Sequence, residues 1–175
     1  MIQKEKTIKT DIIYQGKIVQ LELLEVELED GSLAKREIIR HADGVVIIGI
    51  TKEGKIPFVS QYRKPYDEVV LELPAGKVED GEDPGECAAR EFQEETGYAA
   101  GKIEYLGRAK TSPGYSDETI FVYRATELFP MPLEIDEGEF LDIMEYTKEE
   151  VSQLVREDRL RDAKSLAAVC LDMLK

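Results

Sequence analysis

The residues best suited to chemistry in this chain are three glutamates, Glu91, Glu94 and Glu95, which lie within one short segment. On a helix, Glu91 and Glu95 would stand one turn apart on the same face. Like charges at this spacing destabilise an isolated helix by about 0.2–0.5 kcal/mol, so a helix with only a structural role would avoid them. Clusters of carboxylate oxygens suit hard divalent cations such as Mg²⁺ or Mn²⁺, which also neutralise phosphates. The glutamates therefore predict a divalent-cation site.

The helix that must position these glutamates has both of its ends encoded in the sequence. Asp83 can cap the first free amides, and Pro84 suits the first helical position. Gly97 can adopt the left-handed conformation that ends a helix. Phe92 recurs at core-facing spacing with an alanine about one turn before it, so the segment should bury one face and expose the other.

The segment from Gly76 to Tyr98 reads Gly-x5-Glu-x7-Arg-Glu-apolar-x-Glu-Glu-x-Gly-apolar. This spacing resembles the signature of the Nudix hydrolases, and every fixed position is filled. The alternative, a solvated acidic helix with ordinary caps, does not explain why Arg90, both glycines and Glu82 keep this register. Outside the signature, Gln61-Tyr-Arg63, Leu73-Pro-Ala-Gly-Lys77, Pro113 and Asp162-Ala-Lys-Ser165 resemble the ADP-ribose pyrophosphatase branch of the family.

The resemblance implies an α/β fold, a Nudix-type α/β/α sandwich around a mixed sheet with the signature as a loop–helix–loop beside it. It also implies Mg²⁺-dependent hydrolysis, with Mn²⁺ as a possible substitute, of the diphosphate of ADP-ribose or a related nucleoside diphosphate sugar to AMP and ribose 5-phosphate. One alternative is a Nudix hydrolase of another nucleotide, such as an oxidised nucleoside triphosphate. Another is a non-catalytic module that senses a nucleotide or a metal. Three intact, mutually repelling glutamates favour an enzyme.

Within the same resemblance, Glu91 and Glu95 hold the metal with the carbonyl of Ala75, and Glu94 contributes directly or through water. Arg90 orients a glutamate, and the role of Glu82 stays open between a ligand and a support for the loop. A late carboxylate in the acidic loop 135–139 is the general base or a further ligand. By register this is Glu139, with Glu137 as the alternative, although the loop could also be a solvated turn.

Four residues form the predicted substrate-binding set: Arg63, Arg36, Glu37 and Ser112. A guanidinium has the right shape for a phosphate, which suits Arg63 at the end of a strand. Arg36 could stack on or bind the nucleotide, and Glu37 could accept from the adenine amine. The alternative for Arg36 and Glu37 is a surface ladder of salt bridges, which contributes little energy.

The composition limits the other classes of function. The chain has 175 residues and a formal charge of −14, which disfavours non-specific binding to nucleic acids and anionic membranes. The N-terminus lacks a signal peptide, and no apolar run reaches the roughly 18 residues of a membrane span, so we expect a cytoplasmic protein. Cys87 and Cys170 lack the spacing of a metal or disulfide motif and are predicted to be buried thiols.

The elements around the signature fall into two predicted domains. Residues 1–40 are an N-terminal antiparallel β subdomain, with a hairpin turn at Asp30-Gly31. Residues 41–175 are the Nudix domain, in which the apolar run Val45–Ile50 indicates a strand buried on both faces. Further strands are predicted at 56–63, 69–73, 105–110, 119–125 and 140–146. Because a hairpin of this size is too small to be stable alone, and because the branch exchanges it between subunits, we expect a homodimer.

Two helices are predicted at the C-terminal end. Thr147 and Glu150 form a capping box at the start of the first. The second runs from about Asp162 to Leu174. Its predicted buried face consists of Leu166, Ala167, Cys170, Leu171 and Leu174.

Overall fold

The computed structural model describes residues 4–133 and 140–175. The chain divides into two compact units. The first comprises Met1–Ala42 with Lys110–Thr119, and the second comprises Asp43–Ala109 with Ile120–Lys175. The first unit therefore includes a segment from the middle of the chain.

The first unit contains an antiparallel sheet of three strands in the order β1-β2-β3. Its strands are β1 (Lys6–Gln15), β2 (Val19–Glu27) and β3 (Leu33–His41). The predicted turn between the last two strands is present: Gly31 has a φ of 81°, and its amide donates to Leu28 O. Leu24 and Val26 of β2 are buried, as their alternation with glutamates predicts. The segment 110–119 joins the sheet through a hydrogen bond of 2.7 Å from Ile39 N to Tyr115 O.

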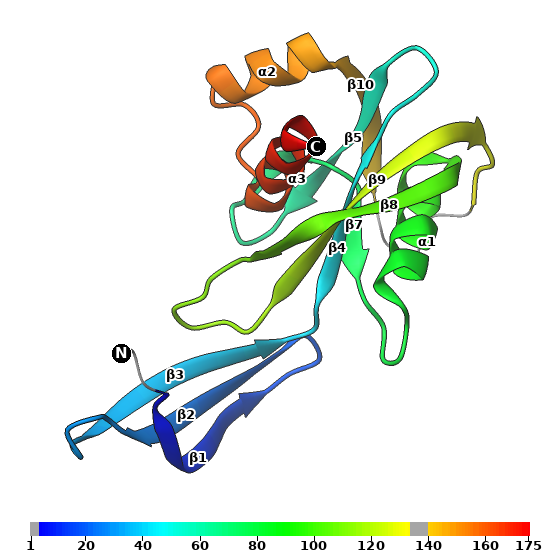
Figure 1. Ribbon diagram of the computed structural model, residues 1–175. Coiled ribbons are helices and arrows are strands. Elements are labelled where there is room, and N and C mark those ends of the chain that lie inside the picture. The colour runs from blue at the N-terminus through cyan, green and yellow to red at the C-terminus, as the bar shows by residue number, and fades with distance from the viewer. Residues whose placement is uncertain (1–3, 134–139) are drawn as a thin grey trace. The chain divides into compact units, whose positions relative to one another are not determined.

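The second unit contains two sheets (Figure 1). The first is mixed, in the order β7-β4-β9-β8, with β4 parallel to β9 and antiparallel to β7. The second is antiparallel, in the order β10-β5-β6. The strands of the mixed sheet are β4 (Gly44–Gly49), β7 (Ala75–Lys77), β8 (Tyr98–Lys110) and β9 (Thr119–Pro130), and those of the antiparallel sheet are β5 (Lys55–Arg63), β6 (Glu68–Glu72) and β10 (Leu141–Thr147).

Helices cover both faces of β4 (Figure 1). Val45 and Ile47 pack with residues of α1 (Pro84–Thr96), among them Phe92. Val46 and Ile48 belong to the cluster that contains residues of α2 (Lys148–Arg156) and α3 (Ala163–Leu174). All six residues of β4 are buried, as predicted for a strand covered on both faces. The predicted α/β/α layering around a mixed sheet is therefore confirmed.

Three of the predictions about the elements are wrong in detail. The strand expected from Tyr105 begins at Tyr98, directly after the glycine that ends α1, and the one expected to stop at Ala125 continues to Pro130. The buried face of α3 is also different, because Ser165, Ala168 and Asp172 are its buried residues.

The hydrophobic residues of α3 do not all point inward. Leu166 and Leu171 pack partly against the core, whereas Leu174 is 76% exposed. Cys87 is buried as predicted, but Cys170 is exposed. The physical reason is that the inward face of α3 is held by polar contacts of Ser165 and Asp172, which rotate the helix away from its most apolar face. Within the described residues, no helix is both long and apolar enough to cross a membrane.

Candidate active site

Helix α1 is fixed at both ends by the residues that the sequence indicated. The Asp83 carboxylate accepts hydrogen bonds from Gly85 N at 2.8 Å and Glu86 N at 3.3 Å, which satisfies two amides that lack a partner within the helix. Gly97 ends the helix with a φ of 72°, and its amide donates to Gln93 O. These two caps set where the glutamates stand along the helix.

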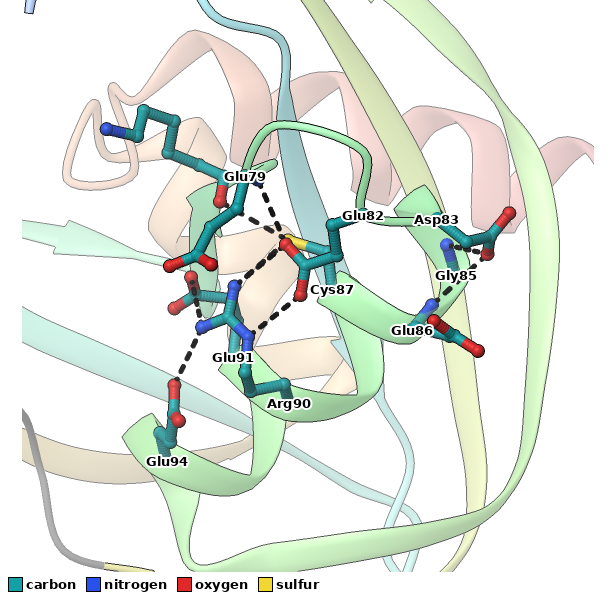
Figure 2. A network of polar contacts seen from close by, with 10 residues as sticks. Glu79, Glu82, Asp83, Gly85, Glu86, Cys87, Arg90, Glu91 and Glu94 are labelled. Carbon is teal, nitrogen blue, oxygen red and sulfur yellow. Dashed lines mark hydrogen bonds and ion pairs between the residues drawn. The ribbon is translucent and has the colours of Figure 1, made fainter.

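Arg90 connects three glutamates in a single network (Figure 2). Its Nε and Nη2 atoms donate to the two carboxylate oxygens of Glu82 at 2.9 and 3.1 Å. Its Nη1 atom donates to Glu91 at 2.9 Å and to Glu94 at 3.0 Å. The hydrogen bond from Arg90, joined by one from the amide of Glu79, lowers the pKa of Glu82 to about 2. Glu82 therefore links Arg90 to the backbone amide of Glu79.

The carboxylate of Glu91 lies directly over the backbone of Gly76. A Cβ atom at position 76 would stand 1.8 Å from Glu91 Cδ, so only glycine allows this side chain to lie there. One turn later, the buried Glu95 accepts a hydrogen bond of 2.9 Å from the amide of Ala75. Glu91 and Glu95 thus contact the backbone of two adjacent residues, Gly76 and Ala75. The carbonyl of Ala75 is one of the predicted metal ligands.

Arg63, at the end of β5, lies close enough to this cluster to respond to its charge. The pKa of Arg63 is raised, first by its hydrogen bonds to Glu72 and, against the opposing effect of burial, also by the charges of Glu72 and Glu95. Its side chain remains 40% exposed. The structure therefore brings together five of the predicted site residues: Ala75, Glu91, Glu94, Glu95 and Arg63.

Of the other five predicted site residues, three belong to the first unit and two lie outside the described residues. Arg36 and Glu37 are on β3, and Ser112 is in the segment 110–119, so all three belong to the first unit. Arg36 pairs with Glu5 at 2.6 Å, and Glu37 is exposed. The Ser112 carbonyl accepts from the amides of Tyr115 and Ser116 in a turn. Glu137 and Glu139 lie outside the described residues.

A family model described as "NUDIX domain" matches residues 40–169. The chain belongs to the Nudix family. This confirms the resemblance seen in the sequence, and with it the assignment to the Nudix hydrolases.

Several curated Nudix relatives and a solved structure resemble the whole chain. It is 46% identical over 168 residues to a methanol dehydrogenase activator of Bacillus methanolicus, covering 95% of this chain and 91% of the relative. It is 42% identical over 174 residues to an ADP-ribose pyrophosphatase of Bacillus subtilis, covering 98% and 94%. The crystal structure of an ADP compounds hydrolase matches 99% of this chain and 95% of its own with a TM-score of 0.88, at 20% identity, which supports the fold.

Nudix hydrolases generally use a divalent metal ion, and the residues of this site fit one. Within residues 4–133 and 140–175, no three acidic, histidine or cysteine side chains already converge as ligands. Glu91 and Glu94 are instead both hydrogen-bonded to Arg90. The donors around Ala75 and Gly76 are nevertheless all oxygens, and Glu91 rests in a space that a Cβ atom would fill. Hard oxygen donors of this kind suit Mg²⁺ or Mn²⁺ rather than a thiolate-binding metal.

Sequence reasoning missed three residues that hold the site in place. Glu72 is almost fully buried and pairs with Arg63, Lys164 of α3 pairs with Glu72, and Ser165 binds the backbone of Leu73. Lys164 and Ser165 belong to the segment Asp162-Ala-Lys-Ser165, whose resemblance to the pyrophosphatase branch was the available signal.

Proposed function

We propose that this chain hydrolyses the diphosphate bond of ADP-ribose, or of a related nucleoside diphosphate sugar, in a reaction that depends on Mg²⁺. The convergence of Glu91 and Glu95 on Ala75 and Gly76 is the observation that carries the proposal. The similarity to an ADP-ribose pyrophosphatase over nearly the whole chain supports the choice of substrate. The products would be AMP and ribose 5-phosphate.

In this proposal, Glu91, Glu95 and the Ala75 carbonyl hold the cation, and Glu94 contributes directly or through water. When bound, the cation neutralises phosphate oxygens and lowers the pKa of water. Arg90 keeps Glu91 and Glu94 in place through its hydrogen bonds to both carboxylates. Arg63 binds a phosphate through the exposed part of its guanidinium. Glu139, or alternatively Glu137, accepts the proton of the attacking water.

The experiment that tests the proposal is incubation of the protein with MgCl₂ and a panel of nucleotides, followed by separation of the products. The panel contains ADP-ribose, other nucleoside diphosphate sugars and an oxidised nucleoside triphosphate. We expect ADP-ribose to be converted to AMP and ribose 5-phosphate, and EDTA to abolish the conversion. Turnover of the triphosphate alone would make an oxidised nucleoside triphosphate the substrate in place of ADP-ribose. No turnover of any nucleotide would favour a non-catalytic sensor.

The similarity to the methanol dehydrogenase activator favours a second candidate function. In this case the chain would raise the activity of a methanol dehydrogenase. Adding the purified protein and MgCl₂ to such an enzyme tests the idea, with the Glu95→Gln variant as a control. Stimulation by the wild type alone would link activation to the glutamate cluster.

We further propose that the protein is a homodimer in which the first unit completes the partner's site. Strand β1 exposes Ile12, Ile13 and Tyr14 by more than half of their surface, which is more apolar surface than an edge strand in water should show. A second copy would cover these residues and bring Arg36, Glu37 and Ser112 to the partner's nucleotide. Light scattering should then give a molar mass near twice 19.8 kDa.

Subunit mixing tests the exchange itself. Arg36→Ala and Glu95→Gln subunits are each expected to be weakly active, whereas a mixture should regain activity because one site of each hybrid dimer carries neither change. A monomer at micromolar concentration contradicts the assembly. A dimer without recovery keeps the assembly but places Arg36 in its own subunit's site, or in none.

A further inference from the structure

The start of α3 is attached to the strand that leads into the candidate active site. Asp162 caps the helix by accepting from Ser165 N at 3.0 Å, and it also accepts from Ser165 Oγ at 2.5 Å. Ser165 Oγ in turn accepts from the amide of Leu73 at 2.7 Å, and both of these residues are fully buried. A buried amide needs such a partner, so Ser165 fixes the backbone at Leu73.

One residue earlier, Glu72 is held between two cations. Its carboxylate accepts from Arg63 Nε at 2.7 Å and from Arg63 Nη2 at 2.8 Å, and it pairs with Lys164 Nζ. Burial raises the pKa of Glu72, but the hydrogen bond from Arg63 and the charge of Lys164 outweigh it and leave the pKa lowered. Glu72 is therefore a carboxylate at neutral pH, and both cations remain paired with it.

This arrangement fixes the direction of the Arg63 guanidinium. Nε and Nη2 face Glu72, and within the described residues Nη1 has no hydrogen-bond partner. Arg63, Glu72 and Lys164 line one pocket together with Tyr66 and Arg161. Lys164 also lines this pocket, but its side chain is only 18% exposed and is paired with two carboxylates, those of Glu72 and Asp162.

The same short segment also ends at the metal-binding residues. From Glu72 the chain continues through Leu73 and Pro74, whose carbonyl accepts from Ile47 N at 2.9 Å, to Ala75. The amide of Ala75 donates to Glu95. Residues 72–75 are thus anchored by α3 at one end and by α1 at the other, so this segment and Arg63 connect α3 to the site.

We propose that Lys164 and Ser165 are positioning residues of the active site, which hold Glu72 and Leu73 and thereby pre-orient Arg63 for the phosphate of the substrate. The inference rests on the proposed function, because it takes Arg63 as the phosphate-binding residue. A guanidinium already held by a bidentate pair loses little further freedom when a phosphate binds. Without Lys164, Glu72 is held less firmly, and Arg63 must be ordered by the substrate.

The chain offers a matched control in a second network of the same type. At the other end of α3, the buried Asp172 accepts from Arg124 Nε at 2.6 Å and pairs with Lys148 at 3.4 Å. Lys148 thus joins α2 to a buried carboxylate of α3, and none of these three residues belongs to the proposed site. Replacing Lys148 removes a more exposed lysine from a buried carboxylate of the same helix without reaching Arg63.

The test compares steady-state kinetics of ADP-ribose hydrolysis in MgCl₂ for Lys164→Met, Lys164→Arg and Lys148→Met. Lys164→Met should raise KM about 3- to 10-fold and change kcat less than about twofold, since the lost interaction binds substrate and transition state alike. Lys164→Arg should bring KM back close to the wild-type value. Lys148→Met should change neither KM nor kcat. If Lys164→Met does not fold, Lys164→Gln takes its place in the comparison, with the same expected change in KM.

A double-mutant cycle with Arg63→Ala separates positioning from a general loss of structure. If Lys164 acts through Arg63, Lys164→Met should have no further effect on KM in the Arg63→Ala background. Additive effects of the two changes on KM would overturn the inference, and so would an unchanged KM in Lys164→Met alone. The proposed function would still stand in either case, as long as the wild type hydrolyses ADP-ribose. A wild type without turnover of any nucleoside diphosphate derivative would overturn the proposed function, and this inference with it.

Discussion

Two arginine-centred networks lie in the same unit and differ in their balance of charge. At α1, Arg90 pairs with three carboxylates, those of Glu82, Glu91 and Glu94, and these four residues together carry a formal excess of two negative charges. Beside it, Arg63 and Lys164 face two carboxylates, Glu72 and Asp162, so the second network is neutral.

The difference shows which network needs a further partner. Arg90 offsets only part of the negative charge of these carboxylates, so the cluster can still attract a divalent cation. The network of Glu72 is complete within the protein and can stabilise the fold by itself. Removing a proposed metal-binding glutamate of α1 should therefore chiefly lower activity, whereas removing Glu72 should chiefly lower stability.

The largest expected effect is on turnover in the Glu95→Gln variant. Glutamine keeps the size of the side chain and can still accept from the Ala75 amide, but it removes the charge that binds the cation. We expect nearly all Mg²⁺-dependent hydrolysis to disappear, because even outer partners of a metal site are worth about 10–100-fold. The free energy of unfolding, measured in EDTA, should be unchanged or slightly higher, because the repulsion between the glutamates of the helix falls.

Glu86→Gln provides the matched control for this variant. Glu86 is an exposed glutamate on the same helix, and its removal changes the charge of the protein equally. It should leave the turnover close to that of the wild type. Near-normal hydrolysis by Glu95→Gln would instead remove Glu95 from the metal ligands.

The next largest effect concerns Glu139, the carboxylate that we propose as the general base. If Glu139 is the general base, Glu139→Gln should lower kcat by about 10²–10⁴-fold while substrate binding largely survives. Glu137→Gln should have a smaller effect in the same assay. The reverse order would assign the role to Glu137 and shift the register by two residues.

On the balanced side, Glu72→Gln should destabilise the fold. It leaves Arg63 and Lys164 close together without the buried carboxylate that they share. We expect a loss of about 3 kcal/mol, near the lower end for a broken buried pair because Arg63 is partly exposed. Urea unfolding in EDTA measures this loss. Glu104→Gln, at an exposed glutamate with long ion pairs, should change stability by less than about 0.5 kcal/mol.

The α1 region could be predicted from the sequence because its signals are local. Asp83 and Gly97 mark the helix ends within the segment itself, and Phe92 marks the buried face. Arg90 and Glu94 stand one turn apart along the helix, so their pairing follows from helical geometry. Only the position of Gly76 under Glu91 depends on how the loop folds back onto the helix.

The network of Glu72 could not be predicted in the same way, because its members are distant in sequence. Lys164 and Ser165 lie 92 residues from Glu72 and Leu73 respectively. The hydrophobic pattern of α3 even points the wrong way, since it places Leu174 inside and Ser165 outside. A polar buried face gives no periodic signal, and only the folded arrangement shows that Ser165 and Asp172 are anchors.

The smallest expected effect is a change in the pH dependence of stability at Glu82. Its pKa is lowered from an ordinary value near 4.5 to about 2 by the hydrogen bonds from Arg90 and the Glu79 amide. A carboxylate with a depressed pKa in the folded state stabilises the protein fully above its unfolded value. That contribution is lost as the pH falls from about 4.5 toward 2. Arg90 keeps its hydrogen bonds to Glu91 and Glu94 through Nη1, so the Glu82 contribution is a small one.

Glu82→Gln should therefore lower the melting temperature at pH 6, and the gap to the wild type should narrow as the pH falls toward 3. Thermal unfolding in EDTA at several pH values measures the gap without interference from metal binding. A gap that stays constant from pH 6 to pH 3 would show that Glu82 supports the loop by packing and hydrogen bonding alone. In that case the charge of Arg90 would be balanced by Glu91 and Glu94, and the excess negative charge available to a cation on α1 would be smaller than the comparison of the two networks implies.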